Sequence, residues 1–407
     1  MAIRVDPTLL DDMERYGAPD IKACFNCGNC TAVCPLSEGD DAFPRRMIRH
    51  VQLGQRDALA ASKEVWMCYY CGECSETCPR EAAPGELMAA ARRFAIGRFD
   101  PTTLARRMFT STAFNIGWMV VLFAILVGFL LGTSDVLPEG RVNTASLLEW
   151  IPFHVIHDMG LAVIIILGVL AVVALVNMLW LLSRETSAQG APQPPATPSR
   201  FPLKAALLAL GDMVGEVIRH RRFRDCQTAE SRSDGPLPLR RRFVHLNIMF
   251  GFLGLALATV LDYLFKEPGS YVPLYYPIRL LGTIAGIALM YGATVAMIQR
   301  ARKPERAYFD RSTVSDWALL IFLWIIGATG FVLEIAEYVT MSGISVDIVF
   351  LVHVGLAMEL LLLLPFTKFA HIIYRPVALW YFAFRARRMG VIPNNMGFAE
   401  PQKESAA

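Results

Sequence analysis

Two groups of cysteines near the start of the chain have the residue type and the spacing to hold metal. Each follows the pattern C-x2-C-x2-C-x3-C-P; the members are Cys24, Cys27, Cys30 and Cys34 in the first group and Cys68, Cys71, Cys74 and Cys78 in the second. This spacing is typical of [4Fe–4S] clusters, and with two clusters the fourth cysteine of each group binds the other cluster. We therefore predict two [4Fe–4S] clusters, with the ligand sets Cys24, Cys27, Cys30, Cys78 and Cys68, Cys71, Cys74, Cys34.

Zinc and disulfide bonds are the alternatives for so many cysteines. Zinc sites usually draw their ligands from two separated pairs, and disulfides do not persist in a reducing compartment. Neither explains the repeated spacing as well as two iron–sulfur clusters do. The chain is therefore expected to carry electrons, and the ninth cysteine, Cys226, is expected to be a free thiol.

The histidines are the second set of residues that could bind a metal. Five of the seven lie in or at the ends of apolar segments: His154, His157, His245, His353 and His371. Ionisable residues at membrane depth are costly and usually functional. On one continuous helix, His353 and His371 would share a face and stand about 27 Å apart. They would then serve two centres, one near each membrane surface.

We predict two b-type hemes, each bound by two histidines at matching depth. The inner heme would use His245 and His371, and the outer heme His157 and His353, with His154 kept as the alternative to His157. The sequence has no C-x-x-C-H motif, so covalent attachment is not expected. Interfacial histidines satisfied by water are the competing interpretation, and His220 is expected at the surface.

Six apolar segments are long enough to place these histidines in a membrane, which takes roughly 20 residues per span. Hydrophobic residues make up 54% of the chain, and the mean hydropathy is +0.40. The segments are 113–132, 155–182, 243–265, 278–298, 317–339 and 347–370. Between the cysteine groups, apolar patterns predict helices over 44–53 and 58–66. The expected fold is mostly α, a helical dicluster ferredoxin domain followed by a six-span transmembrane bundle.

The loop charges predict the orientation of the spans. Lysine and arginine gather before the first span, between the second and third, between the fourth and fifth, and after the sixth. These segments fall on one side, which the positive-inside rule assigns to the cytoplasm. Both termini and both clusters would then face the cytoplasm, at the cytoplasmic membrane. The net charge of +3 follows from this bias and from contact with anionic lipid, and nucleic acid is not an expected partner.

The chain is expected to divide into four parts. Residues 1–100 form the cluster domain, 101–112 a linker, 113–382 a membrane cytochrome b domain with a cytoplasmic loop at 183–242, and 383–407 a basic, disordered tail. Within the loop, apolar residues recur at helical spacing over 203–218. This pattern predicts a helix at the membrane surface or on the cluster domain.

No nucleotide-binding glycine motif of the G-x-G-x-x-G or P-loop type is present. The substrate chemistry at the cytoplasmic end is therefore expected to belong to another subunit.

The cysteine-rich part resembles the C subunit of heterodisulfide reductases. The membrane part resembles the gamma (cytochrome b) subunit of respiratory nitrate reductases, especially in the spacing of His353 and His371. The fusion resembles the C subunit of the quinone-interacting membrane-bound oxidoreductase (Qmo) family. That resemblance implies flavin- and iron–sulfur-containing cytoplasmic partners, of the heterodisulfide-reductase A and Qmo A and B types. It also implies electron exchange between menaquinone or ubiquinone and adenylylsulfate reductase.

The expected function is electron transfer between the quinone pool and a cytoplasmic flavin or iron–sulfur partner. Quinone is expected to react near the outer heme, between residues 154–158 and His353; a site beside His220 at the inner surface is the alternative. A membrane arm of another heterodisulfide-reductase-like complex and a non-catalytic membrane anchor are the alternative functions.

Overall fold

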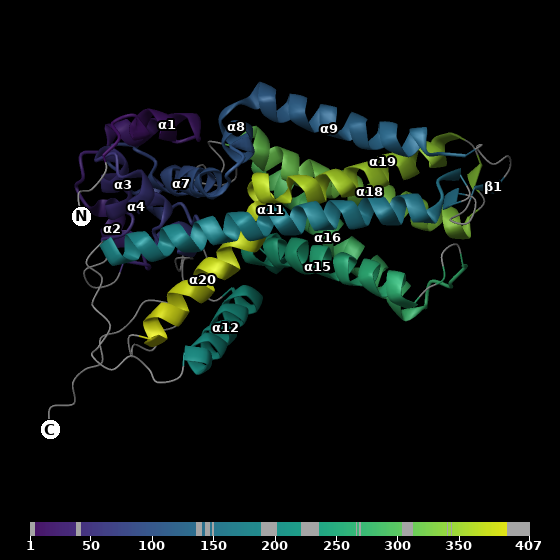
Figure 1. The fold of residues 1–407 in the computed structure, drawn as a ribbon. Coiled ribbons are helices and arrows are strands. Elements are labelled where there is room, and N and C mark those ends of the chain that lie inside the picture. Colours follow the sequence, from purple (N-terminus) through teal and green to yellow (C-terminus); the bar gives the residue numbers. More distant parts are fainter. Residues whose placement is uncertain are drawn as a thin grey trace.

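The computed structural model describes residues 5–37, 42–135, 141–142, 147–148, 150–188, 202–220, 236–265, 267, 270–302, 312–339, 341–342 and 344–388. In these residues the fold is mostly α, as predicted. The strands described are two residues long, β1 (Arg141–Val142) and β2 (Met341–Ser342), and pair antiparallel. Figure 1 shows a small helical domain at one end of a long helical bundle.

The small domain carries the cysteines and is built from short helices around α7. Its elements are α1 (Leu9–Arg15), η1 (Pro19–Ala23), α2 (Asn29–Val33), α3 (Arg45–Gln52), α4 (Arg56–Ala60), α5 (Glu64–Met67), α6 (Glu73–Glu76) and α7 (Pro84–Phe99). Helix α3 confirms the helix predicted over 44–53, whereas α4 and α5 divide the one predicted over 58–66. Leu87 and Phe94 of α7 share one buried core with Leu9, Ile48 and Trp66.

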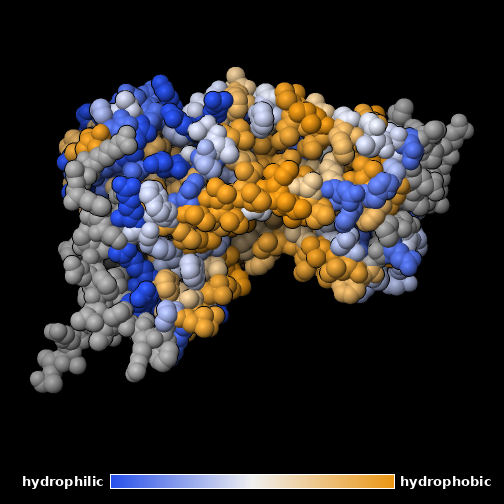
Figure 2. All heavy atoms as spheres, viewed as in Figure 1, coloured by the Kyte–Doolittle hydropathy of each residue, from blue (hydrophilic) through white to orange (hydrophobic). Residues whose placement is uncertain are grey.

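Six of the described helices are long and apolar enough to cross a membrane. They are α9 (Thr112–Gly132), α11 (Phe153–Ala188), α15 (Arg241–Phe265), α16 (Pro277–Arg302), α18 (Val314–Tyr338) and α19 (Ile344–Leu363); the qualifying stretch of α11 ends at Arg184, and that of the sixth span is Val346–Phe366. Figure 2 shows a broad apolar belt over the bundle and polar residues gathered at the end that carries the cysteine domain. Large apolar side chains left exposed in this way are typical of a surface that faces lipid.

The sixth apolar segment differs from its prediction. Helix α19 ends at Leu363, and two 3-10 turns, η3 (Leu364–Phe366) and η4 (Lys368–Ala370), separate it from α20 (His371–Arg388). The prediction of one continuous helix from His353 to His371 is therefore wrong. Pro365, inside η3, has no backbone N–H to donate and its ring clashes with the preceding turn, so the α-helix cannot continue through it.

Helix α20 continues past residue 382, where the membrane domain was expected to end. Residues 383–388 are therefore helical, and the rest of the expected tail lies outside the described residues, as does Cys226. The expected linker contains α8 (Leu104–Thr110), and the loop before α15 contains the turn η2 (Leu237–Leu239).

Helix α12 (Pro202–Arg219) confirms the helix predicted over 203–218. It lies alongside α20, apart from the main bundle (Figure 1). The Arg387 guanidinium donates two hydrogen bonds to the Asp212 carboxylate, at 2.7 and 2.9 Å. The apolar residues of α12 are mostly exposed, for example Leu203 and Leu207.

A buried ion-pair network joins the cysteine domain to the bundle. Asp316, at the start of α18, is 4% exposed. It accepts hydrogen bonds from Arg93 of α7 at 3.0 Å and from Lys368 of η4 at 2.6 Å. It also closes the capping box of α18, by accepting from the backbone N–H of Thr313 at 2.9 Å. One carboxylate thus neutralises cations from both parts of the protein.

We predict that Asp316→Ala lowers the free energy of unfolding by about 3 kcal/mol, because removing one partner of a buried pair leaves the cations uncompensated. Asp57→Ala is the control, since Asp57 pairs with Arg98 at the surface and such pairs contribute at most about 1 kcal/mol. Thermal unfolding of both variants in detergent would measure this. Equal loss in the two variants would contradict the role given to the buried network.

Candidate metal centres

The two cysteine groups begin with loops of the same conformation. In the first loop the backbone N–H of Asn26 donates to Cys24 Sγ at 3.4 Å, and in the second the N–H of Tyr70 donates to Cys68 Sγ at 3.3 Å. Asn26 and Tyr70 both have positive φ angles, of 63° and 57°. Each loop therefore turns its backbone towards its own sulfur, and such N–H donors stabilise a thiolate that binds metal.

A glycine follows the second cysteine of each group and requires its own conformation. Gly28 and Gly72 both have φ of 92°, in the left-handed region that side chains disfavour. Each precedes a short helix, α2 or α6, that carries the third cysteine, Cys30 or Cys74. The repeated spacing in the sequence thus corresponds to a repeated local structure.

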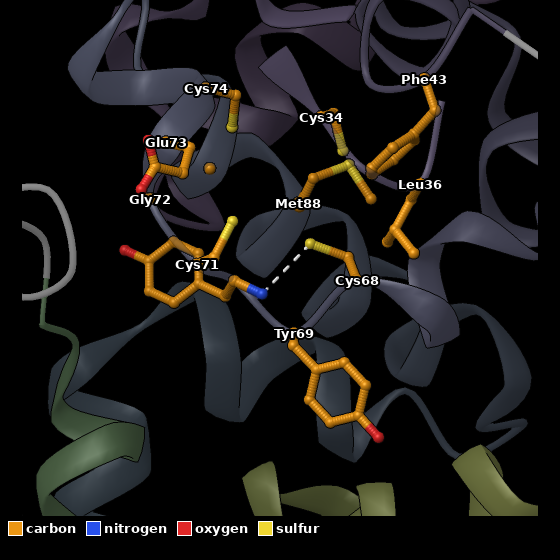
Figure 3. A pocket seen from close by; sticks show the side chains of 12 residues that line it. Cys34, Leu36, Phe43, Cys68, Tyr69, Cys71, Gly72, Glu73, Cys74 and Met88 are labelled. Atoms are coloured by element: carbon orange, nitrogen blue, oxygen red, sulfur yellow. Dashed lines mark hydrogen bonds between the residues drawn. The ribbon is translucent and has the colours of Figure 1, made fainter. Parts of the chain in front are cut away.

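Cys34 of the first group lies with three cysteines of the second. Cys34, Cys68, Cys71 and Cys74 line one cavity. Figure 3 shows their four sulfur atoms facing the same space, although they come from three separate segments. The structure therefore brings together the crossed set expected for one cluster.

Cys30 lies near the cysteines of the other expected set. Burial raises the pKa of the Cys30 thiol, and Cys24, Cys27 and Cys78 raise it further through their charges. Burial likewise raises the pKa of Cys34 to about 12. Metal binding must then displace the thiol protons, because the thiolate is the ligand.

A single metal ion is not the fitting occupant of these groups. Among the described residues, no three His, Cys, Asp or Glu side chains are close enough to hold one ion. Cubane ligands bind separate irons, so they need a wider spacing than the ligands of one ion. The donor set therefore fits the cluster expected from the sequence.

Two of the predicted heme ligands meet where the cysteine domain joins the bundle. The ring centres of His245 on α15 and His371 at the start of α20 are 6.4 Å apart. Two imidazoles that bind opposite sides of one metal, each through a nitrogen at about 2 Å, have ring centres roughly 6 Å apart. The observed separation therefore fits a shared iron.

The hydrogen bond of His371 favours the tautomer that metal binding needs. Its Nδ1 lies 2.7 Å from the carbonyl oxygen of Lys368, so the proton belongs on Nδ1 and Nε2 is left as a ligand. Burial lowers the pKa of His371 to about 4, and the nearby Arg92 and Lys368 lower it further. The ring is therefore neutral near pH 7, as a ligand must be.

A third histidine, His220, belongs to the same group, and its prediction as a surface residue is wrong. It follows α12 with φ of 47° and is 5% exposed. Its ring centre is 5.0 Å from that of His245, which is shorter than the roughly 6 Å expected across one metal. His371 therefore fits better than His220 as the partner of His245. The basic residues around His220 gave no sign of this burial.

The histidine group also holds buried polar atoms that lack a hydrogen-bond partner. They are Nδ1 of His220, Nδ1 of His245, Nε of Arg242 and Nη2 of Arg375. Burial, with Arg375 and Arg242 nearby, lowers the pKa of His220 to about 4. Unpaired buried donors are costly, and the carboxylates of a porphyrin would satisfy them. The residues present therefore fit a heme at this end.

The predicted outer pair is not brought together. His353 on α19 faces α18, where its Nδ1 lies 3.1 Å from the carbonyl oxygen of Ile326 and 3.0 Å from Oγ1 of Thr329. His157 on α11 stacks on Tyr263 of α15, with ring centres 5.2 Å apart. Within the described part of the chain, no ring contact or hydrogen bond joins the two histidines. The pairing of these two stays a prediction.

His154 and His157 differ in their surroundings. His154 is exposed, whereas His157 is partly buried and its Nδ1 lies 3.1 Å from a carboxylate oxygen of Asp158. This contact leaves Nε2 of His157 as the candidate ligand nitrogen. His157 therefore remains the better candidate of the two.

Fold and sites together define an iron–sulfur protein with six helices fit to span a membrane. A 4Fe-4S dicluster domain model matches residues 20–82, and the model of the family Citrate utilization protein B matches residues 105–391. The chain belongs to the Citrate utilization protein B family. This assignment was not predicted from the sequence, which had suggested the nitrate reductase gamma subunit for the membrane part.

Curated relatives support both halves. Citrate utilization protein B of Escherichia coli is 29% identical over 37% of this chain and 39% of its own length. The iron-sulfur C subunit of CoB--CoM heterodisulfide reductase from Methanopyrus kandleri is 29% identical over 34% of this chain and 70% of its own length. A protein of Archaeoglobus profundus that is like the C subunit of heterodisulfide reductase is 36% identical over 23% and 50%.

The chain thus spans between 39% and 70% of the length of these relatives. No solved structure matches it. The predicted resemblance of the cysteine-rich part to the C subunit of heterodisulfide reductase is confirmed, and with it the class of iron–sulfur electron-transfer proteins.

We predict that Cys34→Ala damages the cluster held by Cys68, Cys71 and Cys74, because its sulfur faces their cavity. Cys78→Ala is the matched control and should damage the other cluster. EPR spectroscopy of the reduced variants would distinguish the two cluster signals. If Cys34→Ala removed the signal that Cys27→Ala also removes, the crossed assignment would be wrong.

Proposed function

We propose that this chain is the membrane subunit of a quinone-dependent oxidoreductase. It would exchange electrons between the quinone pool and cytoplasmic flavin- or iron–sulfur-containing subunits, through two b-type hemes and two [4Fe–4S] clusters. The clusters and hemes supply one-electron carriers. The protein supplies their ligands, their order and the exclusion of water.

The observation that carries this proposal is the histidine group beside the cysteine domain. His245 and His371 stand 6.4 Å apart, next to unpaired buried donors of Arg242 and Arg375. Structural histidines in a protein core normally have their polar atoms satisfied. A buried cationic pocket with two neutral imidazoles is therefore better explained by an anionic, metal-containing cofactor.

The basic loops give the proposed orientation, with the cysteine domain and both termini in the cytoplasm. The domain division at 1–100, 101–112 and 113–382 is proposed with it, the last part now extended to Arg388 by α20. The outer end of the bundle then carries His154, His157 and His353. We place the quinone head group there, because the exposed His154 and the His157–Asp158 pair offer hydrogen-bond and proton-transfer partners.

The cytoplasmic partner has two candidates. The Qmo resemblance favours flavin subunits linked to adenylylsulfate reductase, and the name of the family favours a partner in citrate use. The relatives named as subunits of heterodisulfide reductase support assembly with other redox subunits. Identification of the co-purifying proteins by mass spectrometry would choose between the two.

We predict that His245→Ala and His371→Ala each remove the same heme, and that His353→Ala removes the other. Heme content per chain should fall from about two to about one in each variant, since a heme that loses one of its two axial ligands is held weakly. Optical redox titration of each variant would show which heme is lost. His50→Ala, a substitution within the cysteine domain, should retain both hemes.

Loss of different hemes in the His245 and His371 variants would contradict the pairing. A purified protein without heme would contradict the function itself and favour a non-catalytic membrane anchor.

We also predict that a short-chain quinol reduces the hemes of the purified protein, and that a bound quinone-site inhibitor lies beside His154 and His157. Cryo-electron microscopy of the inhibited complex would locate it. Inhibitor density beside His220, with none at the outer end, would contradict the outer site.

A further inference from the structure

The two cysteine loops carry an aromatic residue at the same position, and the two residues face different surroundings. Phe25 follows Cys24 and is 60% exposed. Tyr69 follows Cys68, is partly buried, and points away from the four sulfur atoms in Figure 3. Since the loops have the same backbone conformation, the difference comes from what each loop packs against.

Tyr69 packs on the histidine group of the bundle. Its hydroxyl donates to Oε1 of Glu216 on α12 at 2.6 Å, and its ring centre is 6.0 Å from that of His220. The Arg375 guanidinium of α20 lies 3.9 Å from the centre of the same ring, in a cation–π contact. Three contacts thus fix one side chain of the second loop.

The ring contacts continue into the bundle. His220 lies 5.0 Å from His245, which lies 6.4 Å from His371. Arg92 of α7 holds the start of the second loop by donating to the carbonyl oxygen of Cys68 at 2.6 Å. The polypeptide around Cys68 is therefore in unbroken packed contact with the histidine group.

The first loop has its described contacts within the cysteine domain instead. The side chain of Asn26 donates to Gln52 at 2.7 Å, and Gln52 donates to the carbonyl oxygen of Cys24 at 3.0 Å. Arg80 lies over the Phe25 ring at 5.9 Å. Cys27 is exposed, whereas its equivalent Cys71 is partly buried.

On this basis we propose an order for the two clusters, which rests on the proposed function. The cluster site of Cys34, Cys68, Cys71 and Cys74 is the one that exchanges electrons with the membrane centres, across Tyr69 and His220. The other site is the outlet to the cytoplasmic redox subunit, which docks over the surface formed by Phe25 and Cys27. Tyr69 is a positioning residue, because it fills the gap between the second loop and the histidine group.

The electrons balance in a transfer to quinone. Two reduced clusters give one electron each, and one quinone takes these two electrons and two protons from water to become quinol. A cluster with no route to the membrane centres would stay reduced while quinone is present.

The first experiment removes one cluster at a time. Protein in lipid nanodiscs is reduced anaerobically, mixed with excess short-chain quinone, frozen at intervals, and the reduced cluster signal is followed by EPR. In Cys27→Ala the remaining cluster should be oxidised at the rate seen in the unaltered protein. In Cys71→Ala the remaining cluster should be oxidised more slowly, by about tenfold or more.

The second experiment retains both clusters, in case a cysteine variant fails to fold. Tyr69→Leu, which opens a gap beside His220, should slow cluster oxidation by about tenfold while heme oxidation by quinone is unchanged. Tyr69→Phe, which keeps the ring and loses only the bond to Glu216, should retain the rate. Phe25→Leu is the matched control for the equivalent position; it should leave cluster oxidation by quinone unchanged and weaken binding of the co-purifying redox subunit.

The outcomes separate the order from the function. Slow oxidation in Cys27→Ala or Phe25→Leu, with normal oxidation in Cys71→Ala or Tyr69→Leu, would overturn the proposed order alone. Equal rates in all variants would also overturn it. If quinone left the hemes of the unaltered protein reduced, the proposed function would fail, and the order with it.

Discussion

Burial of charge where a polar domain meets an apolar bundle is the constraint on which the rest of the structure depends. Asp316 meets this constraint by pairing with both Arg93 and Lys368. The same backbone carries the metal-site residues: Arg92, next to Arg93, holds the second cysteine loop, and the carbonyl oxygen of Lys368 fixes His371. The network therefore sets the distance between the cluster site and the histidine group, and an electron route needs that distance to be constant.

The two ends of the bundle solve different problems. At the inner end, His220, His245 and His371 are packed among arginines and beside the cysteine domain, where cofactor carboxylates would be neutralised. At the outer end, His353 faces α18 while His157 stacks on Tyr263 of α15. The inner site is thus nearly assembled by the protein alone. The outer site would need a cofactor to bring its histidines into one centre.

The family assignment agrees with this division of labour. The matched regions, 20–82 and 105–391, meet close to the helix α8 that connects the cysteine domain to the bundle. Relatives of the first region include C subunits of heterodisulfide reductase, and the second gives the Citrate utilization protein B family. A dicluster domain joined to membrane helices is therefore a combination of two modules, and the buried network and Tyr69 are what connect them.

The sequence by itself determined the local chemistry, because cysteine spacing, glycine positions and apolar length act over a few residues. It predicted the six spans, helix α12 and the grouping of Cys34 with the second cysteine loop. The tertiary structure decided what depends on distant segments: the end of α19 before Pro365, the burial of His220, and the contact of Tyr69 with the bundle. His220 illustrates the reason, since its burial comes from Tyr69 in the cysteine domain and from His245 on another helix. A local pattern carries no information about such neighbours, because only the packing of the whole chain brings them together.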